Sequence, residues 1–327
     1  MQIRARLPLM SEKREGLFAG RPAIYICVIL GAILVACTYK LRTYTIFACQ
    51  ADGYNSDRYI AYCNGAGYAD YEHGAFWFGL EPVAQDFARN ANVLFLGSSR
   101  LQVALSTAAT ADWFSAVSAR YYLLGFSYNG NVILADELLR RIRPRARAYV
   151  INVDDFFERS ESAPMKTILH DPNARNRYEV KRLWQRVHEP ICKAVPPLCK
   201  NDYVIFRSRE TGAYTKRTGR EKITPVSYDQ AISQNVADSN TAAAVDFLSH
   251  LTVKRECVIL TNVPTVETKI GNVNAIAKAL GADLVTPKIT TELKTYDGSH
   301  LDQLSAELWS QGFFQVASSR IRSCLEE

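Results

Sequence analysis

From residue 91 onward, the chain alternates short apolar runs with longer amphipathic stretches. A short apolar run that ends at a glycine or a polar residue is typical of a strand buried on both faces, whereas an apolar period near 3.6 indicates a helix. The runs predict five strands, over residues 93–97, 120–127, 148–154, 257–264 and 282–287. Helices are expected directly after the first strand and over residues 131–144, 229–252, 270–280 and 301–321. This order predicts an α/β domain with a parallel sheet and helices on both of its faces.

One segment departs from this alternation. Residues 158–228 form an insertion between the third and fourth predicted strands, and they hold 15 Lys/Arg against 8 Asp/Glu. Trp184, Tyr178, Tyr203 and Tyr214 are interleaved with these cations. Two interpretations stay open: a solvated helical subdomain, or a cationic and aromatic wall that binds an anionic or sugar ligand.

The N-terminal part contains the longest apolar stretch. Residues 22–39 form 18 consecutive positions without a charged side chain, and at about 1.5 Å per residue this length is near the lower limit for crossing a hydrocarbon core. Five basic residues precede the stretch, and basic flanks stay in the cytoplasm. In a Gram-negative bacterium this predicts a single-pass protein of the inner membrane with a periplasmic domain. The expected organisation is a basic cytoplasmic tail over 1–22, a transmembrane anchor over 23–39, an aromatic-rich connecting segment over 40–90 and the domain over 91–327.

Two other interpretations of the same stretch also export the domain. A cleaved secretory signal peptide has an apolar centre of similar length. The sequence Leu34-Val35-Ala36-Cys37 resembles a lipoprotein signal-peptidase box, in which Cys37 would carry the lipid. The sequence alone does not separate these alternatives from an uncleaved anchor.

The net charge of +6 belongs mostly to this N-terminal region. Residues 1–42 contain seven Lys/Arg and two Asp/Glu, so the remaining chain carries a net charge of only +1. A nucleic-acid-binding domain needs a concentration of basic residues on its surface. We therefore expect no nucleic-acid partner.

Six of the eight cysteines lie outside the apolar stretch. An even number in an exported domain is compatible with disulfides, and Cys49 with Cys63 or Cys192 with Cys199 would close short loops. The connectivity stays open, and for Cys257, which lies in the apolar run CVIL, the alternative interpretation is a buried small hydrophobic residue without a disulfide. The chain contains no CxxC pair and no HExxH motif, so the sequence predicts no zinc site and no other metal or cofactor.

Candidate chemistry lies at the two ends of the α/β pattern. Ser98 and Ser99 follow Gly97 after the first predicted strand, where reactive groups of open α/β sheets gather. Asp297 and His300 lie three residues apart, just before the last predicted helix. A serine hydroxyl is a weak nucleophile until a histidine removes its proton, and that histidine needs a carboxylate to fix its tautomer. Ser99, His300 and Asp297 are therefore a candidate catalytic triad.

The blocks LFLGSSR at 94–100 and YDGSHLD at 296–302 resemble the first and last conserved blocks of the SGNH (GDSL-like) hydrolase family. The resemblance covers roughly residues 91–320 apart from the insertion. It implies a flavodoxin-like three-layer α/β/α sandwich with a parallel sheet. It also implies Ser99 as the nucleophile, His300 as the general base and Asp297 as its orienting acid.

The two middle blocks of the family depart from its pattern in this chain. In the second block, Tyr128 stands where a glycine is expected, although Asn129 and Gly130 follow at once. In the third block, Asp154 replaces the oxyanion asparagine, and an ionised carboxylate cannot donate a hydrogen bond. Arg100 could pair with an anionic substrate or with Asp154, and the structural salt bridge with Asp154 is the preferred interpretation. The remaining candidate oxyanion donors are the Ser99 amide, the backbone of Tyr128, Asn129 and Gly130, and the Asn129 side chain.

These departures resemble the membrane-anchored SGNH-like proteins of cell-surface polymer acylation, including the DltD and alginate-acetylation types. The resemblance implies a membrane-anchored serine esterase or O-acyltransferase that acts on acyl, chiefly acetyl, esters of a cell-surface polysaccharide. It further implies a membrane-bound O-acyltransferase as a partner. The alternative is a non-catalytic SGNH-like binding or assembly protein of an exopolysaccharide or cell-envelope complex.

Overall fold

The computed structural model describes residues 22–43, 47, 49–63, 70–128, 130–199, 203–217 and 223–326. At its centre lies a parallel sheet of four strands in the order β3-β2-β4-β8. The strands are β2 (Val93–Ser98), β3 (Tyr121–Phe126), β4 (Ala148–Asn152) and β8 (Val258–Thr261). All of their residues are buried, which explains why they are apolar almost without interruption. Four of the five predicted strands are confirmed.

The fifth predicted strand, over residues 282–287, is reduced to one parallel bridge between Leu284 and Leu260. Val285 still donates its amide to the Leu260 carbonyl, at 2.8 Å. Asp283 and Thr286 flank this short contact, and Pro287 follows. The segment is too short and too interrupted for a longer ladder, because proline removes a backbone donor.

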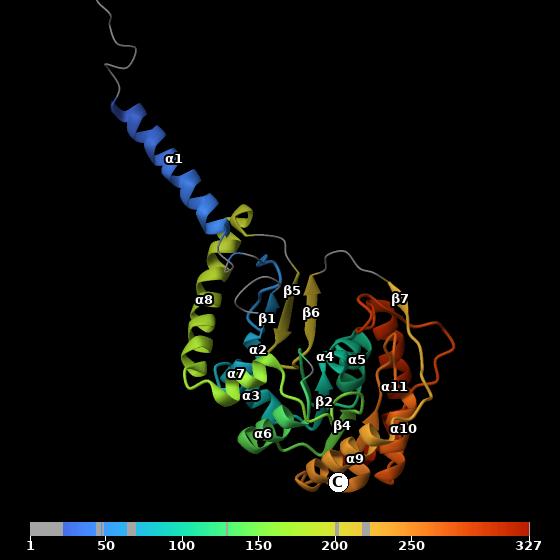
Figure 1. Ribbon diagram of the computed structural model, residues 1–327. Helices are drawn as coiled ribbons and strands as arrows, with labels where there is room; N and C mark the ends of the chain where they lie inside the picture. Colours follow the sequence, from blue (N-terminus) through green and yellow to red (C-terminus); the bar gives the residue numbers. More distant parts are fainter. Residues whose placement is uncertain are drawn as a thin grey trace, which may run out of the picture.

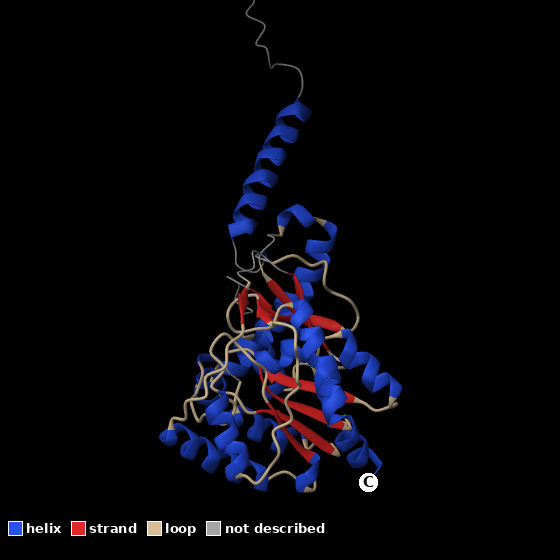
Figure 2. Ribbon diagram, turned by 90° about the vertical axis from the view of Figure 1, so that its right-hand side faces the viewer, coloured by secondary structure: helices blue, strands red, loops and turns tan. Residues whose placement is uncertain are grey.

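Helices cover both faces of this sheet, as Figure 2 shows. One face packs against α3 (Pro82–Arg89), α6 (Val132–Ile142), α9 (Gln234–Ser249) and α10 (Ile270–Ala279). The other face packs against α4 (Ser99–Leu105), α5 (Ala108–Ala116) and the long C-terminal helix α11 (Gln303–Glu326). Along β2, Leu94 and Leu96 face the first group and Val93 and Phe95 the second, as the period of two in a strand requires. The predicted α/β class with a parallel sheet is therefore confirmed.

A second sheet joins the connecting segment to the insertion. Strand β1 (Arg58–Cys63) of the connecting segment pairs antiparallel with β5 (Val204–Ser208) of the insertion, and β5 pairs with β6 (Tyr214–Arg217). The insertion also supplies α7 (Ala163–His170), α8 (Ala174–Ala194) and the short 3-10 helix η2 (Pro196–Leu198). The remaining elements are the 3-10 helix η3 (Arg255–Cys257) and a short pair formed by β7 (Thr224–Pro225) and β9 (Lys294–Thr295).

The connecting segment has a clear structural role that its sequence did not reveal. Its helix α2 (Tyr71–Trp77) is buried at every position and contacts both α7 and α8. A helix that is buried all around has no polar face, so its sequence has no amphipathic period. This explains why the pattern over residues 43–90 predicted no element there.

Three disulfides join the six cysteines outside the apolar stretch. Cys49–Cys63 and Cys192–Cys199 close the short loops that the sequence allowed. The interpretation of Cys257 as an unbonded hydrophobic residue is wrong, because Cys257 is bonded to Cys324 of α11. Cys257 lies in η3, directly before β8, and contacts the C-terminal turn of α11. Both cysteines are buried, and an apolar sequence around a buried cysteine is the same whether or not the sulfur is bonded.

Helix α1 (Pro22–Thr43) projects away from the rest of the molecule (Figure 1). Its side chains over residues 22–37 are exposed. The segment of this helix over residues 22–40 is long and apolar enough to cross a membrane. A signal sequence near the N-terminus would meet the same criteria of length and composition. Cys27 and Cys37 lie on this helix with exposed, unbonded sulfurs. The structure thus contains one helix that fits either a membrane anchor or an export signal.

Candidate active site

Ser99 lies at the carboxyl end of β2, where this strand passes directly into α4. The hydroxyl of Ser98 caps the helix by accepting a hydrogen bond from the Arg100 amide at 3.3 Å. The turn needs a glycine before it, because a Cβ atom at Gly97 would lie only 2.9 Å from Leu101 Cβ and 3.1 Å from Asn152 Cβ. The sequence therefore fixes Ser99 at a tight junction between strand and helix.

Asp297 and His300 are held together by a turn that follows β9. One carboxylate oxygen of Asp297, Oδ1, accepts hydrogen bonds from the amides of Ser299 at 2.9 Å and His300 at 2.8 Å. Gly298 has φ +87°, a left-handed conformation that favours glycine. The imidazole of His300 stacks on the ring of Tyr296, with centroids 5.6 Å apart. The backbone of this turn thus orients the two side chains toward each other.

A continuous chain of hydrogen bonds connects the three predicted triad residues. Ser99 Oγ lies 2.8 Å from His300 Nε2, and His300 Nδ1 lies 2.7 Å from Asp297 Oδ2. Burial raises the pKa of Asp297, but the hydrogen bonds from His300 and Ser299 outweigh burial and lower this pKa to about 2. An ionised Asp297 accepts a hydrogen bond from Nδ1–H of His300, which leaves Nε2 without a proton and able to accept the one from Ser99. The geometry is that of a serine nucleophile beside its general base.

The triad opens into a cavity of about 250 Å³ whose walls are mainly aromatic. Its lining comes from the parallel sheet, the connecting segment and the insertion together, and consists of Tyr62, Ser99, Val103, Ser127, Tyr128, Tyr203, Ile205, Tyr214, Tyr296, Asp297 and His300. Five of these eleven residues are tyrosines, which combine an apolar ring with a hydroxyl that can bind a polar group. The cavity therefore suits a small ligand with both apolar and polar parts.

The insertion contributes two of its tyrosines to this cavity, but not Tyr178 or Trp184 and none of its described cations. Arg207 pairs with Glu72, Arg209 with Glu81, and Lys181 with Asp70, all of them carboxylates of the connecting segment. Among the residues that the structure describes, no Lys or Arg of the insertion lines the cavity. The hypothesis of a cationic wall is therefore not supported at this site, whereas Tyr203 and Tyr214 do reach it.

The loop after β3 contains the candidate oxyanion residues. Tyr128 has φ +51°, so the residue that stands where the family has glycine adopts a conformation that glycine favours. Its side chain is 43% exposed and forms part of the cavity wall. Gly130 is buried so closely against Phe126 that a Cβ would lie 2.7 Å from Phe126 Cβ. Asn129 lies outside the described residues.

Hydrogen bonds to buried charged and polar residues fix the position of this loop. The Ser127 amide donates to Glu72 Oε1 at 2.8 Å, and the Ser127 carbonyl accepts from His73 Nε2 at 3.0 Å. The other oxygen of Glu72 accepts from Arg207 at 2.9 Å and from the Tyr214 hydroxyl at 2.6 Å. Sequence reasoning missed this network, although a Glu-His pair within the aromatic run YADYEHGAFWF, at 68–78, was a signal that could have indicated it.

Arg100 connects the first, third and last sequence blocks. Its guanidinium lies 3.3 Å from Asp154 and 2.9 Å from Asp155, and its Nε donates to Ser299 Oγ at 3.1 Å. The expected salt bridge with Asp154 is confirmed. Burial raises the pKa of Asp154 to about 6, and the charge of Arg100 offsets part of this rise. Arg100 thus ties the loop that holds Asp297 and His300 to the carboxyl end of β4.

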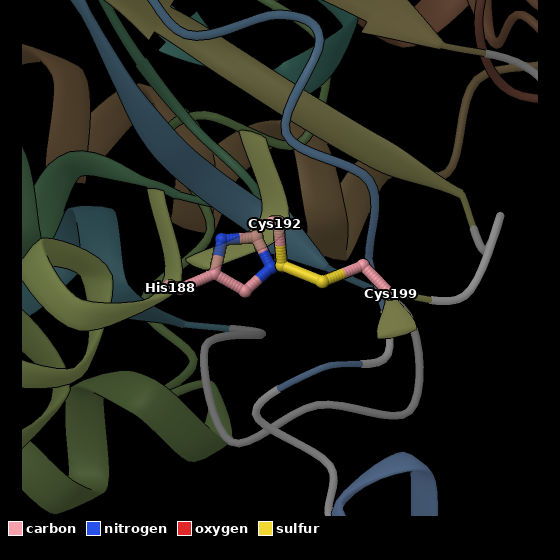
Figure 3. Close-up of side chains that lie close together, drawn as sticks. All are labelled: His188, Cys192 and Cys199. Atoms are coloured by element: carbon pink, nitrogen blue, oxygen red, sulfur yellow. A yellow bond between two sulfur atoms is a disulfide. The ribbon is translucent and has the colours of Figure 1, made fainter. Parts of the chain in front are cut away.

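Within the described part of the chain, one other group of side chains has the chemistry of metal ligands. Cys192, Cys199 and His188 have their ligand atoms within 4.8 Å of one another, but the two sulfurs are joined to each other (Figure 3). His188 Nε2 lies 2.8 Å from the Cys49 carbonyl, and Nδ1 lies 3.3 Å from the Tyr54 hydroxyl. Because both sulfurs are in a disulfide and both ring nitrogens are in hydrogen bonds, this group lacks free metal ligands. We interpret it as a structural cluster that packs with residues of β1 and β5.

Comparison with known proteins gives no relative for this chain. No family model matches it, and no match was found among curated proteins or solved structures.

Proposed function

We propose that this protein is a serine esterase or O-acyltransferase of the SGNH type, with Ser99 as nucleophile, His300 as general base and Asp297 as orienting acid. The observation that carries the proposal is the unbroken hydrogen-bond chain from Ser99 Oγ through His300 to Asp297. Ser99 and His300 lie 201 residues apart in sequence and meet at hydrogen-bond distance, with the histidine in turn bonded to a carboxylate, which is the geometry that a nucleophile, its base and the orienting acid require.

The proposed reaction has two steps. Ser99 Oγ attacks the carbonyl carbon of an ester while His300 Nε2 accepts its proton, and the alcohol then leaves with that proton to give an acyl-serine. In the second step a water molecule or a sugar hydroxyl attacks the acyl carbon, gives its proton to His300, and restores Ser99. Hydrolysis and transfer differ only in this second nucleophile.

The position of the site in the fold supports this assignment. Ser99 follows a central strand of the parallel sheet, and Asp297 and His300 precede the last helix, as in the flavodoxin-like sandwich that the family resemblance implies. The proposed oxyanion donors are the Ser99 amide and the backbone at Tyr128 and Gly130, in the loop that Glu72 holds.

The N-terminal helix and the disulfides support a place outside the cytoplasm. Disulfides persist in oxidising compartments, and three of them join residues on the domain side of α1. We propose a single-pass anchor in the inner membrane with the domain in the periplasm, and lipidation at Cys37 is the alternative form of attachment. The proposed substrate is an acylated cell-surface polysaccharide, and a membrane-bound O-acyltransferase is the proposed partner.

Turnover of a simple ester tests the proposal. The full chain in lipid nanodiscs is expected to release nitrophenol from p-nitrophenyl acetate, and Ser99→Ala is expected to lower this rate about 10³-fold or more. Ser115→Ala, at an exposed position on α5, is the matched control and should keep the wild-type rate. A folded wild-type protein without Ser99-dependent turnover would instead favour the non-catalytic binding or assembly role.

A further inference from the structure

A second, larger cavity is lined by residues next in sequence to the proposed triad. Ser99, Asp297 and His300 line the aromatic cavity, whereas their chain neighbours Arg100 and Gly298 line a cavity of about 560 Å³. The first and last sequence blocks therefore contribute residues to both cavities. A ligand in the larger cavity would lie next to the residues that carry the proposed chemistry.

The larger cavity is formed at the carboxyl ends of β4 and β8, where open α/β sheets bind ligands. Asp154 follows β4, Asn262 follows β8, and Asn240 reaches the cavity from α9. Asn240 is 7% exposed and Asn262 is 4% exposed. Both amides are thus more than nine-tenths buried at the wall of a polar cavity.

Three of these polar groups are available to a ligand. In the part of the chain that the structure describes, the Asn240 and Asn262 side chains make no hydrogen bond, and their amides line the cavity. Asp154 is paired with Arg100 through Oδ2, but its Oδ1 is buried without a partner. Asn272, in the same wall, differs because its Oδ1 accepts a hydrogen bond from the Ser233 amide at 2.7 Å. A ligand in the cavity can therefore exchange hydrogen bonds with the Asn240 and Asn262 amides, and a hydroxyl group can donate to the unpartnered Asp154 Oδ1.

The charges of the wall restrict the ligand. Asp154, Asp155, Glu158 and Glu267 face the cavity against only two cations, Arg100 and Lys269. Arg100 is already committed to Asp154 and Asp155. The excess of carboxylates repels an anionic ligand, whereas hydroxyl groups can donate to carboxylates and exchange hydrogen bonds with amides in both directions.

We propose that this cavity binds an uncharged, hydroxyl-rich sugar residue, which is the glycan part of the substrate whose ester meets Ser99. That the bound sugar is part of the substrate rests on the proposed function. That it is uncharged and rich in hydroxyl groups rests on Asn240, Asn262 and the carboxylates of the wall. The inference excludes a uronate polymer as the preferred glycan.

Binding of defined oligosaccharides tests this inference. The full chain with Ser99→Ala, in nanodiscs, is titrated calorimetrically with cellohexaose, with N-acetylated chitohexaose and with hexagalacturonate. At least one of the two neutral oligosaccharides is expected to bind at least tenfold more tightly than the uronate. Asn240→Leu and Asn262→Leu, which keep the side-chain volume, are expected to weaken that binding at least tenfold, while Asn274→Leu should not change it. Asn274 is the matched control because it lies exposed on α10 and does not line the cavity.

The inference is overturned if neither neutral sugar binds, if the uronate binds as well as the neutral sugars, or if both leucine variants bind like the control. Should a leucine variant fail to fold, Asn262→Ser removes the amide without adding apolar bulk. Failure of the proposed function is distinguishable, because sugar binding without Ser99-dependent ester turnover would leave the sugar site standing. Ester turnover without sugar binding would overturn only the sugar site.

Discussion

Arg207 and Glu72 form an ion pair that is fully shielded from solvent. Arg207 Nη1 lies 2.9 Å from Glu72 Oε2, and neither side chain has any exposed surface. The same carboxylate accepts from the Ser127 amide and from the Tyr214 hydroxyl, and both of these residues line the aromatic cavity. The pair therefore joins the insertion, the connecting segment and the loop after β3 at the floor of the site.

Removal of one partner of this pair is expected to destabilise the protein strongly. Arg207→Met leaves the buried Glu72 carboxylate uncompensated and is expected to lower the free energy of unfolding by about 3–5 kcal/mol. Arg209→Met is the matched control, because its ion pair with Glu81 is partly exposed and its loss should cost about 1 kcal/mol. Urea unfolding of both variants measures the difference, and equal losses would contradict a structural role for the buried pair.

At Tyr128, a glycine variant is expected to be more stable than an alanine variant, which is the reverse of the usual order of stability. At φ +51° a residue with a Cβ is strained by about 1 kcal/mol, whereas glycine is not. Tyr128→Gly is therefore expected to be about 1 kcal/mol more stable than Tyr128→Ala. At the exposed Tyr228, which lacks a positive φ, the glycine variant should be the less stable of the two. The same order of stability at both positions would contradict the left-handed conformation.

The raised pKa of Asp154 predicts a pH dependence of stability. A carboxyl whose pKa rises from 3.8 in the unfolded chain to about 6 in the folded protein loses stability as the pH rises through this interval. Asp154→Asn removes that loss. The free energy of unfolding of Asp154→Asn relative to wild type should thus increase by up to about 3 kcal/mol between pH 4 and pH 7. A difference that is constant over this range would show that Asp154 ionises as easily in the folded protein as in the unfolded chain.

The three disulfides should differ in their contribution to stability. Cys257–Cys324 closes a loop with a sequence separation of 67, and Cys192–Cys199 one of 7. Since the entropy of the unfolded chain depends on loop length, replacing the first pair by serine should cost about 4 kcal/mol and replacing the second about 2 kcal/mol. Denaturant unfolding of the two double variants under oxidising conditions checks this order, and the reverse order would contradict it.

The central sheet was predictable from the sequence because β2, β3, β4 and β8 are buried on both faces and therefore read as apolar runs. Ser99, Asp297 and His300 could be selected because their side-chain types and their places after a strand and before a helix indicate one chemistry. The network of Glu72 and Arg207 could not, because 135 residues separate its members and each alone is a single charge in an apolar run. For the same reason, the bond from Cys257 to Cys324 was missed.

The most direct test of the account is covalent labelling of Ser99. The full chain is treated with a fluorophosphonate, which reacts with activated serines, and the modified peptide is located by mass spectrometry. Wild type and Ser115→Ala are expected to carry one label at Ser99, whereas Ser99→Ala and His300→Ala should carry none, because the hydroxyl needs His300 to accept its proton. A folded wild-type protein that stays unlabelled, or that is labelled at another serine, would contradict the assignment of Ser99 as a catalytic nucleophile.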